Sequence, residues 1–218
     1  MPKLLIPILL ALLLALPSCA TGPSKVSSYT IADSTGDWGY PSPYNHYSRG
    51  PGYIRMSFIF ETLVWKDASG FIPQLAEKWE YIQEENAYVF ELCNHATWHD
   101  GARFTADDVV FTFDYTKEHP YQWVDNSIVE SAEAIDEYTV KLYLSKSYAP
   151  FFQDVAGTQP IMPKHIWEDV KEPEKFVAPE AVVGTGPYTL ADYSKEHGTY
   201  LYQAYNDYYL GEPFVDEI

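Results

Sequence analysis

The chain is poor in positive charge, in cysteine and in long apolar stretches. Its 218 residues include 14 Lys and Arg against 31 Asp and Glu, which gives a formal net charge of −17. Nucleic acids and anionic membrane surfaces are bound through Lys and Arg, so neither is expected as a partner. Two cysteines are too few for a disulfide scaffold or for a zinc site made of cysteines.

Aromatic residues are abundant, at 17% of the chain, with 19 Tyr, 11 Phe and 6 Trp. Hydrophobic residues make up 46% and charged residues 21%, which is typical of a globular protein. This composition excludes disorder for most of the chain, and the length allows one domain or slightly more. The aromatic content exceeds what folding usually demands, which indicates a binding role for some of the rings.

The longest apolar run covers residues 4–16, too short for a bilayer-spanning helix of about 20 residues. It follows Lys3 and precedes Leu16-Pro17-Ser18-Cys19, so we expect residues 1–18 to be a secretory signal peptide. The segment Leu16-Pro17-Ser18-Cys19 resembles a bacterial lipobox, which implies a lipid on Cys19. Residues 19–28 would then be a flexible, lipidated tether. The alternative is an ordinary signal peptide with an unmodified Cys19.

Hydrophobic periodicity and turn residues predict short strands and helices in alternation. Strands are expected at residues 29–32, 63–65, 77–82, 87–92, 129–135, 138–144 and 200–204, with another after the glycine-rich turn 183–188. Helices are expected at residues 53–63, from Thr105 to His119, and at residues 150–155. The two central strand pairs read as hairpins.

Several residues that could carry chemistry have a simpler structural explanation. Asp107 and Asp108 follow Thr105 at a helix start, where the helix dipole favours carboxylates. His95 and His99 have metal-ligand spacing for a helix, but an Asp-Gly turn follows them, so no zinc site is expected there. The abundant carboxylates leave a hydrolase with two acidic groups open as an alternative.

Two further motifs are absent. The segment Gly184-Thr185-Gly186-Pro187 lacks the lysine of a phosphate loop, and no Gly-x-Ser-x-Gly nucleophile elbow occurs. Cys93 ends a predicted strand and is expected to be a small apolar residue, since no local pattern supplies a base. No catalytic residue, metal centre or cofactor is therefore predicted.

Ordered sequence blocks resemble one known family. They are PQLAEKWE (73–80), YVFEL (88–92), WHDG (98–101), TADDVVFTF (105–113), DEYTV (136–140), YAPF (148–151), PKHIW (163–167), GTGPY (184–188) and NDYYLG (206–211). Together they resemble extracellular solute-binding protein family five, the dipeptide-, oligopeptide- and nickel-binding proteins of ABC importers. The resemblance covers essentially all of residues 29–218.

The resemblance implies an α/β fold with mixed sheets, the type II clam-shell of the periplasmic binding proteins. The first lobe would comprise residues 29–63 and 178–218, and an inserted subdomain would comprise residues 64–177. Family members are more than twice as long, so the chain is expected to be an amino-terminal fragment without the second lobe. The family also usually has a basic residue where Cys93 stands.

Three loops are implied to face the ligand cleft, at residues 39–47, 121–123 and 157–159. From them the predicted ligand-binding residues are Tyr44, Asn45, His46, Tyr47, Tyr121, Trp123, Gly157 and Thr158. Aromatic faces and backbone amides suit an extended ligand that is held without reading every side chain. Trp123 could equally be a core residue.

The resemblance implies a substrate-binding lipoprotein that is not an enzyme. It would be exported and anchored by Cys19 to the outer face of a membrane or in the periplasm. It would capture di- or oligopeptides and deliver them to the permease subunits of an ABC transporter. The alternatives are a nickel, metal-chelate or oligosaccharide ligand on the same fold, a secreted hydrolase, and a fragment that binds nothing alone.

Overall fold

The computed structural model describes residues 24–218 except 33, 35, 48–49 and 122. The expected signal peptide and Cys19 therefore lie outside the described residues. The helices are α1 (Pro51–Ser57), α2 (Ala106–Glu118), α3 (Lys164–Trp167), a π-helical turn Phe152–Ala156 and 3-10 turns Pro173–Lys175 and Pro179–Val182. Within this part of the chain, none of the helices has the length and apolar character needed to cross a membrane.

The strands form three antiparallel sheets. They are β1 (Val64–Asp67), β2 (Gly70–Pro73), β3 (Ala76–Ile82), β4 (Ala87–Leu92), β5 (Val129–Asp136), β6 (Thr139–Leu144), β7 (Tyr188–Ser194) and β8 (Thr199–Ala204). The largest sheet has the order β3-β4-β6-β5, while β1-β2 and β7-β8 are two-stranded. Both predicted central hairpins are confirmed, as are β7 and β8.

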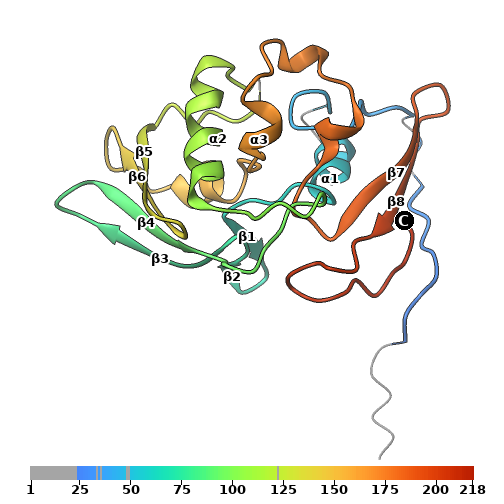
Figure 1. Ribbon diagram of the computed structural model, residues 1–218, viewed down its shortest axis with the longest axis horizontal. Coiled ribbons are helices and arrows are strands. Elements are labelled where there is room, and N and C mark those ends of the chain that lie inside the picture. The colour runs from blue at the N-terminus through green and yellow to red at the C-terminus, as the bar shows by residue number, and fades with distance from the viewer. Residues whose placement is uncertain (1–23, 33, 35, 48–49, 122) are drawn as a thin grey trace, which may run out of the picture.

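Helix α2 lies against the four-stranded sheet and contacts β5 and β6 (Figure 1). The Asp108 carboxylate accepts the Thr105 backbone N–H at 2.9 Å, as the predicted capping box requires. Its other oxygen accepts the backbone N–H of Lys164 at 2.9 Å, which ties α3 to the start of α2. Asp108 thus has the structural role that its position predicts.

The main core lies between α2, the four-stranded sheet and the π-helical turn. Its largest fully buried side chains include Phe90, Trp98, Phe104, Phe113 and Phe151. Phe151 stacks on Tyr88 of β4, with ring centroids 4.6 Å apart and an angle of 7° between the planes. The π-helical turn, predicted as a short helix at residues 150–155, delivers this ring to the sheet.

The β7-β8 ribbon is extended by both ends of the described chain (Figure 1). The segment before Ile218 pairs with β8, through Tyr202 N–H to Ile218 O at 2.9 Å and the reverse bond at 3.0 Å. Val26 bridges Val215 on the outer side. The prediction of a strand at residues 29–32 is wrong: of these residues only Tyr29 donates to this edge, at 2.8 Å to Glu217 O, and none of the four is in a strand.

The prediction of a helix at residues 53–63 is wrong at its end, because α1 stops at Ser57. A turn at residues 58–59 follows, and the segment up to residue 63 has no regular secondary structure and joins two regions of the molecule. On one side Ile59 O accepts Gly186 N–H at 2.8 Å, and on the other Leu63 O accepts Ala76 N–H at 2.8 Å. These tertiary hydrogen bonds outweigh the local helical pattern.

Gly184 is required where the glycine-rich turn meets this segment. A Cβ at Gly184 would lie 1.9 Å from the carbonyl oxygen of Ile59, which no side chain can tolerate. His99 fixes the turn from the other side: its Nδ1 accepts Gly184 N–H at 3.3 Å, and its Nε2 lies 2.8 Å from Gly186 O. His99 is therefore a structural residue, and residues 95–99 are not helical, as the sequence predicts.

Candidate ligand-binding site

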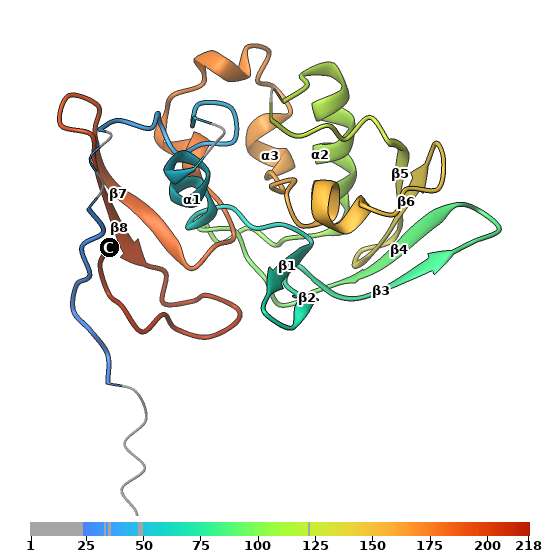
Figure 2. The same ribbon diagram turned by 180° about the vertical axis from the view of Figure 1, so that it is seen from behind.

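Residues 37–47 form a closed loop, which we call the aromatic loop. Gly39 has a φ of 83° and pairs with His46 as an isolated β-bridge, and Tyr47 N–H donates to Trp38 O at 2.8 Å. A Cβ on Gly39 would lie 2.3 Å from Asn45 O, so only glycine allows the two arms of the loop to approach. The loop lies next to α1 and α3 (Figure 2).

The β7-β8 ribbon holds one arm of the aromatic loop. Tyr200 of β8 accepts the Trp38 N–H at 2.8 Å, and its hydroxyl lies 2.9 Å from both Asp37 Oδ1 and Gly39 O. The Tyr193 hydroxyl of β7 donates to the same Asp37 oxygen at 2.8 Å. The Asp37 carboxylate is consequently occupied in fixing the loop.

The tip of the aromatic loop is tied to two other segments. The Tyr44 hydroxyl donates to His119 O, at the end of α2, at 2.7 Å. The Asn45 amide reaches Phe176 O at 3.1 Å and Pro173 O at 3.2 Å. Asn45 therefore shapes the wall of the site with its amide hydrogens already engaged.

Two adjoining hollows lie beside the aromatic loop. The first hollow has a volume of about 460 Å³ and is bordered by the predicted residues Tyr44, Asn45, His46, Tyr47, Tyr121 and Trp123. The second hollow has a volume of about 490 Å³ and is bordered by Trp123, Gly157 and Thr158, with Tyr53, Trp65 and Lys66. The structure thus brings all eight predicted residues around one pair of hollows, with Trp123 between them.

The aromatic rings along the hollows form a continuous row. The Tyr121 ring lies 4.5 Å from Tyr44 and 5.2 Å from Trp123, centroid to centroid. Trp123 meets His46 edge-on at 5.0 Å and Tyr53 at 5.6 Å. Tyr121 is buried and its hydroxyl contacts Met162 Sδ at 3.4 Å, so it supports the row from behind. Burial raises the pKa of Tyr44, Tyr53 and Tyr121, so all three are neutral.

His46 presents the one unsatisfied ring nitrogen among the described residues of this loop. The residue is 7% exposed, and burial lowers its pKa, so the imidazole is neutral at pH 7. Nδ1 lies 2.8 Å from Ser42 O, which places the single proton there. Nε2 is buried with no hydrogen-bond partner in the described part of the chain. His46 borders the first hollow, but Nε2 itself is covered by other protein atoms.

Gly157 and Thr158 contribute a rigid turn to the second hollow. Gly157 N–H donates to Phe152 O at 2.9 Å, and the Thr158 hydroxyl donates to Gln153 O at 2.8 Å. The Gln153 side chain in turn accepts Lys66 Nζ at 2.6 Å. This turn offers mainly backbone and a short methyl-bearing side chain to a ligand.

Other residues of the hollows escaped the sequence analysis because they come from distant segments. Glu174, Tyr193 and Lys195 also border the first hollow, and Tyr53 and Trp65 border the second. Glu174 lies in a 3-10 turn and Lys195 follows β7, and both are exposed. No motif marks them, since their role depends on how the ribbon meets the aromatic loop.

Comparison with known proteins places this geometry in a family. The profile of the bacterial extracellular solute-binding proteins, family 5 Middle, matches residues 70–218. A dipeptide-binding protein of Escherichia coli is 31% identical over 171 residues, covering 67% of this chain and 31% of its own length. Di/tripeptide-binding protein 4 of Pseudomonas aeruginosa is 25% identical over 242 residues, covering 96% of this chain and 43% of the relative. The chain thus spans about a third to two-fifths of these relatives.

Solved structures agree on the fold. The oligopeptide-binding protein of Bacillus subtilis, in complex with a nonapeptide, matches with a TM-score of 0.72 at 24% identity, over 90% of this chain and 40% of that one. A Brucella suis protein in complex with Fe(III)-EDTA matches with a TM-score of 0.71 at 23% identity, over 90% of this chain and 39% of that one. The fold is mixed α/β with antiparallel sheets, as in the type II periplasmic binding proteins. The chain belongs to the bacterial extracellular solute-binding proteins, family 5.

Proposed function

We propose that the chain is part of the peptide-capturing protein of an ABC importer. The observation that carries this proposal is the pair of adjoining hollows with Trp123 between them. Their volumes, about 460 and 490 Å³, suit a small ligand. The names of the relatives, a dipeptide-binding and a di/tripeptide-binding protein, support a short peptide as the ligand.

The chemistry of the first hollow suits a zwitterionic peptide. Exposed Glu174 and Lys195 provide one carboxylate and one ammonium group on its border. His46 Nε2 is buried without a hydrogen-bond partner, so a side-chain movement that uncovers it would let it accept a peptide N–H. The aromatic row adds flat apolar surface that accepts many side chains.

We also propose that residues 1–18 direct export and that Cys19 carries the lipid anchor. The protein would then act outside the cytoplasmic membrane and pass its ligand to permease subunits. Replacing Cys19 by serine should move the mature protein from the membrane fraction to the soluble fraction. An unchanged distribution between the two fractions would leave an ordinary signal peptide as the explanation.

A nickel or metal-chelate ligand is the second candidate, and His46 is the observation that favours it. A neutral imidazole whose Nε2 has no hydrogen-bond partner is a suitable ligand for a divalent transition metal once a side-chain movement uncovers that nitrogen. Titration calorimetry with nickel and with nickel–histidine separates this candidate from the peptide ligand. Heat released by either, together with none from peptides, would favour the metal chelate.

We propose that the protein performs no bond chemistry. The side chains around the two hollows support capture, and the relatives found are solute-binding proteins. Incubation with peptide and glycoside substrates should leave them intact when the products are separated and weighed by mass spectrometry. Turnover that depends on the added protein would favour the secreted hydrolase.

The test of the main proposal is a thermal-shift screen of the full-length gene product. The ligands are a mixture of di- to pentapeptides, nickel salts and oligosaccharides. Because a ligand stabilises the folded state by RT ln(1 + [L]/Kd), a peptide at about 100 times its Kd adds roughly 2.7 kcal/mol and raises the melting temperature. A shift with oligosaccharides alone, or no shift with peptides, would contradict the proposal.

A further inference from the structure

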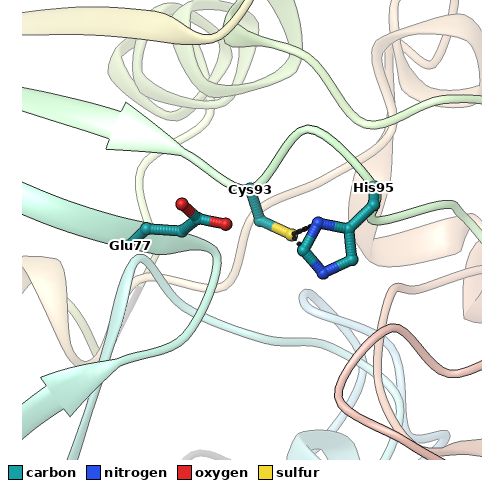
Figure 3. Close-up of side chains that lie close together, drawn as sticks. All are labelled: Glu77, Cys93 and His95. Atoms are coloured by element: carbon teal, nitrogen blue, oxygen red, sulfur yellow. Dashed lines mark hydrogen bonds between the residues drawn. The ribbon is translucent and has the colours of Figure 1, made fainter.

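Three side chains of the types that bind metals lie together at the end of the four-stranded sheet. None of them borders either hollow. Glu77, Cys93 and His95 each offer one ligand atom, and these atoms all lie within 4.8 Å of one another. Cys93 Sγ lies 3.2 Å from His95 Nδ1 and 3.5 Å from Nε2. Figure 3 shows the Glu77 carboxylate and the His95 ring on either side of the Cys93 side chain.

The fold produces this cluster through an irregularity in β3. Ala76 pairs with Leu92 and Lys78 pairs with Glu91, so Glu77 is an extra residue opposite one bond of β4. Such a bulge redirects the side chain of the inserted residue. Cys93, the residue after β4, is fixed next to it by its N–H bond to Leu75 O at 2.9 Å. The sequence alone does not reveal the bulge, so it gives no sign that Glu77 lies beside Cys93.

His95 and His99, which share metal-ligand spacing in the sequence, have different partners in the structure. His99 bonds the glycine-rich turn through both ring nitrogens. His95 turns instead toward Cys93, two residues earlier, and its ring lies edge-on to Tyr209 with centroids 5.9 Å apart. The ring contact holds the imidazole beside the sulfur.

We propose that Glu77, Cys93 and His95 form a site for a divalent zinc ion. A thiolate, an imidazole and a carboxylate are the donors that zinc takes, with a water completing the tetrahedron. Bonds of about 2.3 Å to sulfur and about 2.0–2.1 Å to nitrogen would separate those two atoms by about 3.5 Å. The observed Sγ–Nε2 separation of 3.5 Å matches this edge, and the Sγ–Nδ1 separation of 3.2 Å needs only a small adjustment. Glu77 is exposed, so a change of rotamer can bring its oxygen in.

Burial and charge suit an ion better than a larger ligand. Cys93 is 1% exposed, which keeps an organic substrate from its sulfur, whereas Glu77 and His95 are exposed and can open to an ion. The formal charge of −17 attracts cations to the whole surface. No residue of the cluster borders either hollow, so the site is independent of the proposed transport ligand.

The test uses the full chain with Cys19→Ala, kept reduced, in which Cys93 is the only thiol. Cobalt(II) replaces zinc as the spectroscopic probe. One equivalent of cobalt should produce a thiolate-to-cobalt charge-transfer band in the near ultraviolet together with visible bands of a tetrahedral ion. Zinc should displace the cobalt and remove these bands.

Variants identify the ligands. Cys93→Ser should abolish the charge-transfer band. His95→Ala and Glu77→Gln should each weaken cobalt binding by at least the roughly 10–100-fold that loss of a supporting residue costs in other metal sites. Glu80→Gln, on the same strand, and His197→Ala, on the β7-β8 ribbon, are the matched controls and should bind as the parent does. Circular dichroism checks that each variant is folded.

Three results would overturn the proposal. The first is the absence of a charge-transfer band in the folded parent at stoichiometric cobalt. The second is a stoichiometric visible cobalt spectrum that Cys93→Ser leaves unchanged. The third is a dissociation constant that neither His95→Ala nor the exposed Glu77→Gln alters, which would mean that the two residues are only neighbours of the thiol.

Discussion

Two aromatic regions of the molecule use the same residue types differently. In the main core, the rings of Phe90, Trp98 and Phe113 are fully buried among apolar neighbours. Around the first hollow, Tyr44 and Trp123 are only partly buried and Tyr47 is 60% exposed. The Tyr44 hydroxyl fixes a wall through a hydrogen bond while its ring borders open space. Under the proposed function, the core rings supply stability and the hollow rings supply binding surface.

The largest expected effect comes from the core. Phe90→Ala should lower the free energy of unfolding by about 3–5 kcal/mol, because it removes a fully buried ring and leaves a cavity. Tyr47→Ala, at the exposed ring of the aromatic loop, is the matched control and should change it by less than about 0.5 kcal/mol. Urea denaturation measures both. Equal losses in the two variants would remove the distinction between the regions.

The second effect comes from Glu61, on the segment after α1 that links the glycine-rich turn to β3. It is 1% exposed, accepts the Tyr208 hydroxyl at 2.6 Å and the Gln74 amide at 2.9 Å, and its Oε2 has no partner among the described residues. Burial raises its pKa from 4.5 to about 7. Between these values the unfolded chain ionises Glu61 while the folded chain keeps its proton.

Stability therefore falls as pH rises through this window, by about 3 kcal/mol in total, and the fall is complete above the folded pKa. The contribution is fully present below pH 4.5. Glu61→Gln should remove this component, so the difference in unfolding free energy between variant and parent should grow in the variant's favour from pH 5 to pH 8. A constant difference across this range would show that Glu61 titrates normally. Urea melts at closely spaced pH values provide the measurement.

The third effect concerns binding. Trp123→Ala should weaken peptide binding roughly tenfold, because a central aromatic residue of an interface typically contributes more than 1 kcal/mol. Trp123→Phe keeps a ring between the hollows and should retain most of the affinity. Titration calorimetry on the full-length gene product measures both, with Tyr81→Ala on β3 as a control for general loss of aromatic surface. An unchanged Kd in Trp123→Ala would assign the residue to packing.

Local patterns predicted much of the fold. Alternating residues and turn signals located both central hairpins, and Thr105 with Asp108 located the start of α2. The prediction of a helix beyond Ser57 was wrong because the hydrogen-bond partners of this segment, Gly186 and Ala76, lie far away in sequence. Structure at such a junction depends on tertiary hydrogen bonds that no local window contains.

The candidate site shows the same limit. The resemblance indicated the three loops, and the structure gathers their eight residues around the two hollows. Glu174 and Lys195 were missed because an exposed charge has no sequence signature of its own. Glu77 was missed because the β-bulge that redirects it is visible only from the pairing register of β3 and β4.

Hydrogen–deuterium exchange of the full-length gene product, with and without a saturating bound peptide, tests the central claim most directly. The account predicts that the peptide slows exchange in residues 38–47, in residues 121 and 123–124, and at Gly157 and Thr158, the described segments around the two hollows. The four-stranded sheet should exchange at the same rate in both states. If the bound peptide leaves the exchange rates of all three segments unchanged, the assignment of the hollows as the ligand site is contradicted.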